Sequence, residues 1–154
     1  MKHEHCNTAG GDPERRPDME AAVAAIASNI TTLPAVLAVF GASYDSVTCW
    51  TSGPDRKRWG RARELLCAGW DDGAIMRDAC VALRDVSDYL LELAERFRGS
   101  RTGPFAAVVV ALSHFATVRH VAERRRRELE ARAAAATAQA TDAGESAGGG
   151  NKAA

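Results

Sequence analysis

The chain has 154 residues, which is enough for one domain and little more. Twenty basic residues balance twenty acidic ones, so no overall field attracts the chain to nucleic acid or to an anionic membrane. The four cysteines form no C-x-x-C pair, and the N-terminus has no apolar secretion signal. We therefore expect a cytoplasmic protein without a disulfide framework.

Residues 1–16 are polar and contain Gly10-Gly11 and Pro13, so they are predicted to be a disordered lead. The cluster His3-Glu4-His5-Cys6 offers metal-ligating side chains. A flexible terminus that happens to contain histidine is the simpler interpretation. We therefore predict no metal site and no cofactor.

Apolar residues at helical steps predict the first two helices. The first begins at Pro17, with acidic residues in its first turn. The second begins after Thr31-Thr32, a helix cap that an early-turn proline follows. Gly41 lies on the second apolar stripe and indicates close packing against a neighbour. The two stripes are Met19, Val23, Ile26 and Ile30, and Leu33, Val36, Leu37, Phe40 and Tyr44.

Three more helices are predicted downstream. Asp55 is expected to cap a helix that ends near Gly69. The strongest amphipathic pattern follows, in Ile75, Ala79, Leu83, Val86, Leu90, Leu93 and Phe97. After a glycine-rich stop, Pro104 begins a helix through Val118, which continues for some turns beyond Arg124. Residues from about Thr141 onward are of low complexity and are expected to be unstructured.

Because no strand-like alternation of useful length occurs, the sequence predicts an all-α fold. Its helical domain is expected to span residues 17–122, and an arginine- and alanine-rich tail to span residues 123–154. The run Phe105–Val118 is too short for a membrane-spanning helix. It suits a core helix better than a weak anchor, so membrane contact is expected to be peripheral at most.

Catalysis is not predicted, because no nucleophile, acid–base pair or metal set stands out. Arg124 to Arg127 would suit phosphate contacts, but they lack interleaved aromatic residues and have glutamates close by. A solvated helix surface with ion pairs is the interpretation that we favour, so no nucleic acid partner is expected.

Three short patterns occur in a recognisable order. Leu37 to Tyr44 has the form L-x-x-x-G-x-x-aromatic, with Phe40 and Gly41 inside it. Trp59-Gly60-Arg61 is followed by Leu65-Leu66 and Gly69. Phe97 precedes Gly103-Pro104-Phe105 at a helix junction. Together these patterns resemble the third, first and second homology regions of the Bcl-2 family of apoptosis regulators, across roughly residues 17–120. The chain looks most similar to viral-type members.

The resemblance implies a bundle of five to seven helices with a hydrophobic surface groove. The groove would receive the amphipathic death-motif helix of a pro-apoptotic Bcl-2 relative. Arg61 would pair with an aspartate of that helix, Gly60 would admit its backbone, and Trp59 would hold a helix junction. The other implied binding residues are Leu37, Phe40, Gly41, Tyr44, Leu65, Leu66, Phe97 and Phe105. Association with mitochondria is part of the same expectation.

Three departures from the family pattern modify this expectation. Arg58 replaces the usual asparagine, and Ala42 replaces an aspartate of the third region. The second change favours an inhibitor of apoptosis over a killer. The short spacing from Gly41 to Trp59 predicts that one groove wall is reduced or missing.

Two other interpretations remain open. The chain would alternatively be a helical adaptor that binds an acidic protein or RNA through its arginine-rich C-terminal helix. An exposed apolar groove would also suit a second copy, so a homodimer is plausible.

Overall fold

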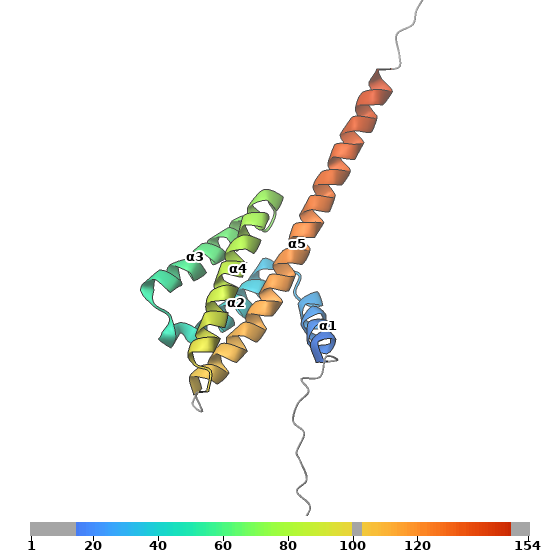
Figure 1. The fold of residues 1–154 in the computed structure, drawn as a ribbon. Coiled ribbons are helices and arrows are strands. Elements are labelled where there is room, and N and C mark those ends of the chain that lie inside the picture. The colour runs from blue at the N-terminus through green and yellow to red at the C-terminus, as the bar shows by residue number, and fades with distance from the viewer. Residues whose placement is uncertain (1–14, 100–102, 149–154) are drawn as a thin grey trace, which may run out of the picture.

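The computed structural model describes residues 15–99 and 103–148, and within them the predicted all-α fold is confirmed. Five α-helices follow one another, with a short 3-10 turn, η1, at Thr48–Trp50 (Figure 1). Their bounds are α1 Arg15–Ser28, α2 Leu33–Val47, α3 Gly53–Ala68, α4 Gly73–Arg96 and α5 Gly103–Ala147.

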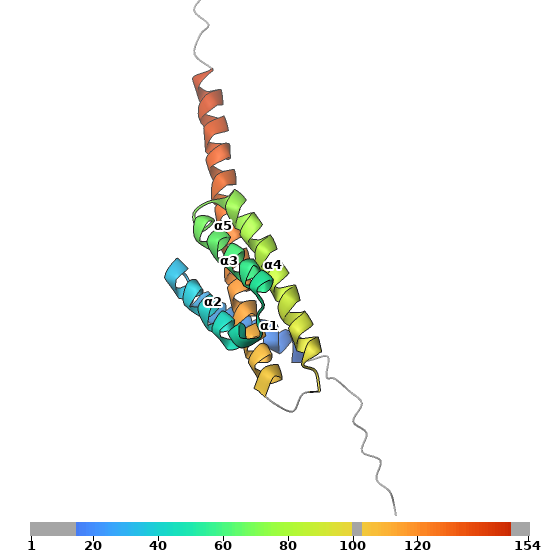
Figure 2. The same cartoon turned by 90° about the vertical axis from the view of Figure 1, so that its left-hand side faces the viewer.

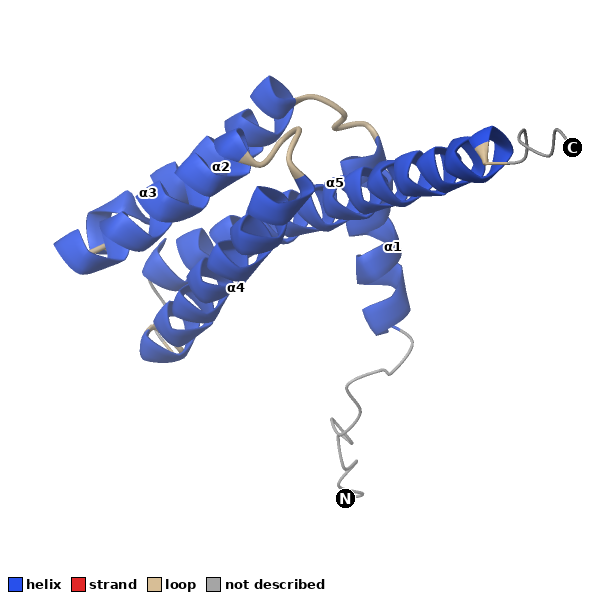
Figure 3. Ribbon diagram, turned by 90° about the horizontal axis from the view of Figure 1, so that it is seen from above, coloured by secondary structure: helices blue, strands red, loops and turns tan. Residues whose placement is uncertain are grey.

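The first half of α5 is the helix around which the bundle forms. α2, α4 and α1 all pack against it, whereas α3 packs mainly against α4 (Figures 1 and 2). Viewed from above, α3 and α1 lie on opposite sides of α5 (Figure 3). The second half of α5 extends beyond the bundle, and its residues 131–147 are all exposed.

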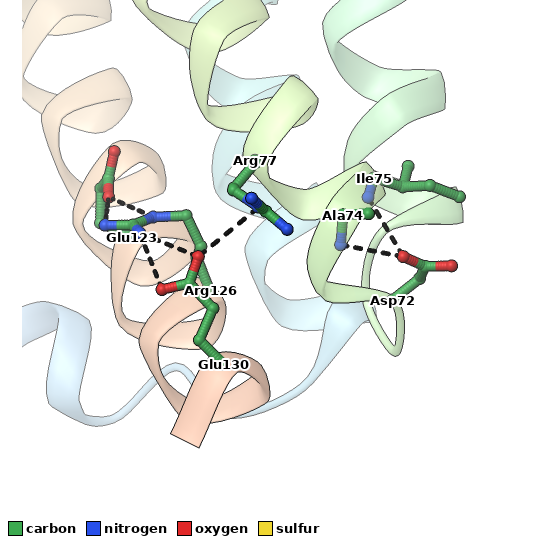
Figure 4. Close-up of polar contacts among 7 residues, drawn as sticks. All are labelled: Asp72, Ala74, Ile75, Arg77, Glu123, Arg126 and Glu130. Carbon is green, nitrogen blue, oxygen red and sulfur yellow. Dashed lines mark hydrogen bonds and ion pairs between the residues drawn. The ribbon is translucent and has the colours of Figure 1, made fainter. Parts of the chain in front are cut away.

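Several helix ends follow directly from local chemistry. Thr32 caps α2, and its hydroxyl accepts a hydrogen bond from the backbone N–H of Ala35 at 3.3 Å. Asp72 caps α4 by accepting bonds from Ala74 and Ile75 at 3.0 and 3.1 Å (Figure 4). The prediction for Asp55 is wrong, because α3 begins at Gly53 with Ser52 at the cap position. Both Ser52 and Asp55 are polar enough to start a helix, so the sequence alone does not distinguish them.

The predicted apolar stripe on α4 forms a large part of the core. Its five central members are buried, namely Ala79, Leu83, Val86, Leu90 and Leu93. From α5, Val108, Ala111, Phe115 and Val118 meet them in one continuous cluster. The first predicted stripe is buried less completely than the α4 stripe. Ile30 is buried, but Met19 and Ile26 are 72% and 58% exposed.

The ends of the chain differ from the prediction. α1 begins at Arg15, two residues before the expected start, and α5 remains helical to Ala147 through the expected unstructured segment. Alanine-rich sequence has high helix propensity, and ion pairs such as Arg126–Glu130 at 3.0 Å join successive turns. The expected domain limit at residue 122 therefore lies inside a continuous helix. The rest of the predicted lead and its histidines lie outside the described residues.

Helix α5 is also long and apolar enough to cross a membrane by length and composition alone. Its most apolar 18-residue window has a mean hydropathy of 1.5, and 39% of that window is buried within the fold. A core helix passes the same test, so the observation does not separate the two roles.

Candidate functional site

Trp59 lies at the centre of an aromatic cluster in the core. Its indole ring is 2% exposed and contacts three rings edge-on. The centroid distances are 5.4 Å to Phe40, 5.2 Å to Tyr44 and 5.3 Å to Phe115. Such edge-to-face pairs add about 0.5–1.5 kcal/mol each beyond the burial of apolar area. Trp59 therefore joins α2, α3 and α5, and its ring is not available to a partner.

The other apolar residues that were predicted to bind a partner differ in how far they are buried. Phe40 and Leu66 are buried like Trp59, so they belong to the core and cannot line an open groove in this conformation. Leu37, Tyr44, Leu65 and Phe97 are half-buried and pack against the same core. Phe105 is 36% exposed on the first turn of α5. The first two sequence patterns thus meet in space, but inside the protein.

Phe97 lies apart from that meeting point. Its ring packs against Trp50 of η1, with centroids 5.9 Å apart. The third sequence pattern therefore contacts the turn after α2 and does not complete a site with Trp59.

The glycines of these patterns have different surroundings. A side chain at Gly60 or Gly41 would meet nothing within 4 Å, so the expected close packing at Gly41 is wrong. At Gly69 a Cβ atom would lie 2.7 Å from the Met76 backbone nitrogen and 2.9 Å from the Leu65 carbonyl oxygen. Gly69 therefore permits the close approach of α3 and α4, whereas Gly60 is open to the outside.

Arg61 lies on the exposed side of α3, beside a groove of 630 Å³ between α3 and α4. We call this the α3–α4 groove. Its α3 wall is basic, and its α4 wall combines two carboxylates with an exposed valine. The lining residues are Pro54, Lys57, Arg58, Arg61, Asp78, Val81, Ala82 and Asp85.

One ion pair crosses this groove. Arg58 lies 3.6 Å from Asp85 on α4 and 3.7 Å from Asp55 on its own helix. The side chains of Arg58 and Asp85 are 43% and 58% exposed, so the pair that crosses the groove contributes little to stability. Arg58 thus links the two walls.

The sequence prediction missed the α4 wall. Val81 is 59% exposed and falls out of step with the buried stripe between Ala79 and Leu83. An apolar residue on the polar side of an amphipathic helix is a usable sign of a contact surface. That sign is weak for one valine alone, because single exposed apolar residues are common.

The arginine run does more than cover a solvated surface. Arg124 donates hydrogen bonds to the carbonyl oxygens of Ala27, at 2.8 Å, and Ile30, at the end of α1. Arg125 donates to the carbonyl oxygen of Trp70 at 2.6 Å and to Asp71 at 2.7 Å. Arginine suits these positions because its guanidinium satisfies the free carbonyls at helix ends.

Arg126 forms the predicted kind of surface network. It pairs with Glu123 and Glu130, both at 3.0 Å, and Arg77 of α4 reaches Glu130 at 3.6 Å (Figure 4). Hydrogen bonds to Glu123 and Glu130 raise the pKa of Arg126. Three of the four arginines are therefore engaged within the chain.

Comparisons with known proteins add no assignment. No protein-family model, curated protein or solved structure matches the chain. Within residues 15–99 and 103–148, no group of three or more histidine, cysteine or acidic side chains is placed to hold a metal ion.

Proposed function

We propose that the chain is a helix-binding interaction protein whose partner lies along the α3–α4 groove. The single observation that carries this proposal is the position of Arg61. This fixed cation is exposed at the edge of the groove, across from Val81 and Ala82 on the other wall. A helix that presents a carboxylate next to an apolar side chain matches that arrangement.

The biological role in this proposal is the one that the resemblance implies. The chain would inhibit apoptosis by sequestering the amphipathic death-motif helix of pro-apoptotic Bcl-2 relatives, without catalysis. Arg61 keeps the part assigned to it by the resemblance, as the partner of an aspartate, and Gly60 leaves open space beside it. The contact surface now consists of α3 and α4 residues, since Trp59, Phe40 and Leu66 are used in the core.

The groove also indicates which partner helices would bind best. Lys57 and Arg61 favour an acidic side chain on one edge, and Asp78 favours a basic one on the other. The apolar floor is small, so charge pairing would carry more of the specificity than apolar anchors. The binding should therefore weaken at high salt.

The test is a titration of labelled death-motif peptides against the wild type, Arg61→Glu and Arg63→Glu. Arg63 is the matched control, because it is exposed on α3 but does not line the groove. We expect Arg61→Glu to weaken binding at least about tenfold and Arg63→Glu to change it little. Equal affinity for all three proteins would remove the groove from the proposal, and no binding by any would remove the death-motif partner.

The adaptor alternative has less support. It requires the arginine-rich segment to be free for an acidic partner or RNA, yet Arg124, Arg125 and Arg126 all bond to other parts of the chain. Replacing both exposed arginines of this segment, Arg127 and Arg132, with glutamate separates the two proposals. Groove binding should survive that change, and adaptor binding through the arginine-rich segment should not.

A further inference from the structure

The exposed apolar side chains gather on two helices that pack together. Of the seven large hydrophobic residues exposed in the described part of the chain, five lie on α1 and α5. They are Met19, Ile26, Phe105, Val109 and Val110. Exposed apolar side chains that share one surface mark an interaction site more often than scattered single residues do.

Helical geometry places most of these residues on one surface. On α5, Phe105, Val109, Ala116, His120 and Arg127 follow at steps of four, seven, four and seven, so they share one side of the helix. On α1, Met19, Val23 and Ile26 do the same. We call these eight residues, with Glu20, the α1–α5 face. Its α5 part is about 33 Å long, comparable to the diameter of a small domain.

A groove of 800 Å³ runs between the two helices on this face. Its apolar lining includes Met19, Val23, Ala24 and Ala116, and its charged lining contains both signs. Glu123 is bound by Arg126, and Arg119 donates to the hydroxyl of Ser87 at 3.1 Å. Glu20 on α1 and Arg127 on α5 are exposed and take part in no ion pair among residues 19–99 and 103–148.

We infer that the α1–α5 face is the interface of a symmetric homodimer. A two-fold interface brings the same surface of each copy together, so it must be complementary to itself. This face meets that condition, because it carries an apolar stripe together with an exposed acid on α1, Glu20, and an exposed base on α5, Arg127. Glu20 of one copy would pair with Arg127 of the other while the apolar stripes cover each other.

Two other properties of the chain agree with this partner. The formal net charge is +0, so two copies do not repel each other over distance. Helix α1, which carries part of the face, lies on the side of α5 opposite α3 (Figure 3), so we expect a dimer to leave the α3–α4 groove open. The dimer can therefore be tested independently of the proposed function.

The test is sedimentation velocity over a concentration series with charge-exchange variants. We expect a reversible dimer in the wild type. Glu20→Arg and Arg127→Glu should each weaken it about tenfold, and the double variant should recover most of the loss. Both altered residues are exposed, so far-UV circular dichroism should show unchanged folding.

An apolar contact is tested in the same way. Val109→Glu on the face should weaken the dimer, whereas Leu91→Glu on α4, at a residue 54% exposed, should not. A monomer at every concentration up to about 0.1 mM would overturn the inference. So would a dimer that none of the face variants changes. A monomer that binds vesicles of phosphatidylcholine and phosphatidylserine through Val109 would assign the face to a membrane instead.

Discussion

Arg125 contacts Trp70 in two ways at once. Its Nε donates a hydrogen bond of 2.6 Å to the Trp70 carbonyl oxygen, and its guanidinium carbon lies 5.1 Å from the centre of the Trp70 ring. The side chain of Arg125 is only 14% exposed, so both contacts are shielded from water. Residues 55 positions apart in sequence are thereby joined, and the turn between α3 and α4 is fixed against α5.

Replacing Arg125 should therefore destabilise the whole bundle. We expect Arg125→Ala to lower the free energy of unfolding by about 2–3 kcal/mol, because a carbonyl and a ring both lose their partner. Arg125→Lys should recover only part of this, since an ammonium cannot bond and stack in the same plane. Urea denaturation followed by circular dichroism measures both. Arg132→Ala, on the exposed part of the same helix, is the control and should change little.

Replacing Trp59 is predicted to lower the stability of the protein, and not to act on peptide binding alone. Trp59→Ala removes the centre of the aromatic cluster and should cost about 3–5 kcal/mol of unfolding free energy. Leu91→Ala, at an exposed site, should cost no more than about 0.5 kcal/mol. Thermal denaturation of both variants gives the comparison. A stable Trp59→Ala protein that loses only peptide binding would contradict the core assignment.

The glycines at positions 60 and 69 should respond in opposite directions to the same substitution. Gly69→Ala places a methyl group against backbone atoms that cannot move aside, and we expect a loss of about 1–3 kcal/mol. Gly60→Ala meets open space in a helix interior and should gain up to about 1 kcal/mol. Differential scanning calorimetry resolves the two signs. Gly60→Ala should also weaken peptide binding if a partner backbone comes close at that position.

Cys80 predicts a loss of stability in strong base. Burial, and then the nearby charge of Glu123, raise the pKa of this thiol from 9.0 to about 11. The folded state therefore favours the neutral thiol. The resulting contribution is complete below pH 9 and is lost as the pH rises toward 11, up to about 3 kcal/mol.

The measurement is denaturant unfolding of the wild type and Cys80→Ala at several pH values from 8 to 11. The difference between the two proteins should shrink or reverse as the pH rises. Burial also raises the pKa of Tyr89, but that group is present in both proteins and cancels in the difference. A difference that stays constant with pH would show that the thiol does not ionise differently in the folded state.

Local patterns in the sequence were enough to predict most of the fold. The α4 stripe from Ala79 to Leu93 and the cap at Thr32 depend on residues within a few positions of each other, and the structure has them as expected. The candidate site was harder. Whether Trp59 faces a core or a partner depends on α2 and α5, which no local pattern places.

The arginine run, Arg124 to Arg127, also shows that local patterns do not predict contacts between residues distant in sequence. Its local surroundings, with glutamates three and four residues away, correctly indicate the ion pairs of Arg126. The bonds of Arg124 and Arg125 reach the ends of α1 and α3, which are distant in sequence. Free carbonyls at helix ends are a general feature, but which arginine meets which end is decided only when the helices pack.

Helix α5 begins in the centre of the bundle and continues without a break to Ala147. The exposed part of α5 is about 25 Å long, and it continues directly from the part of the helix against which α1, α2 and α4 pack. A small rotation of α5 inside the bundle is therefore magnified at the far end. A fluorophore placed at Ser146 would report on packing events near Phe115 without touching them.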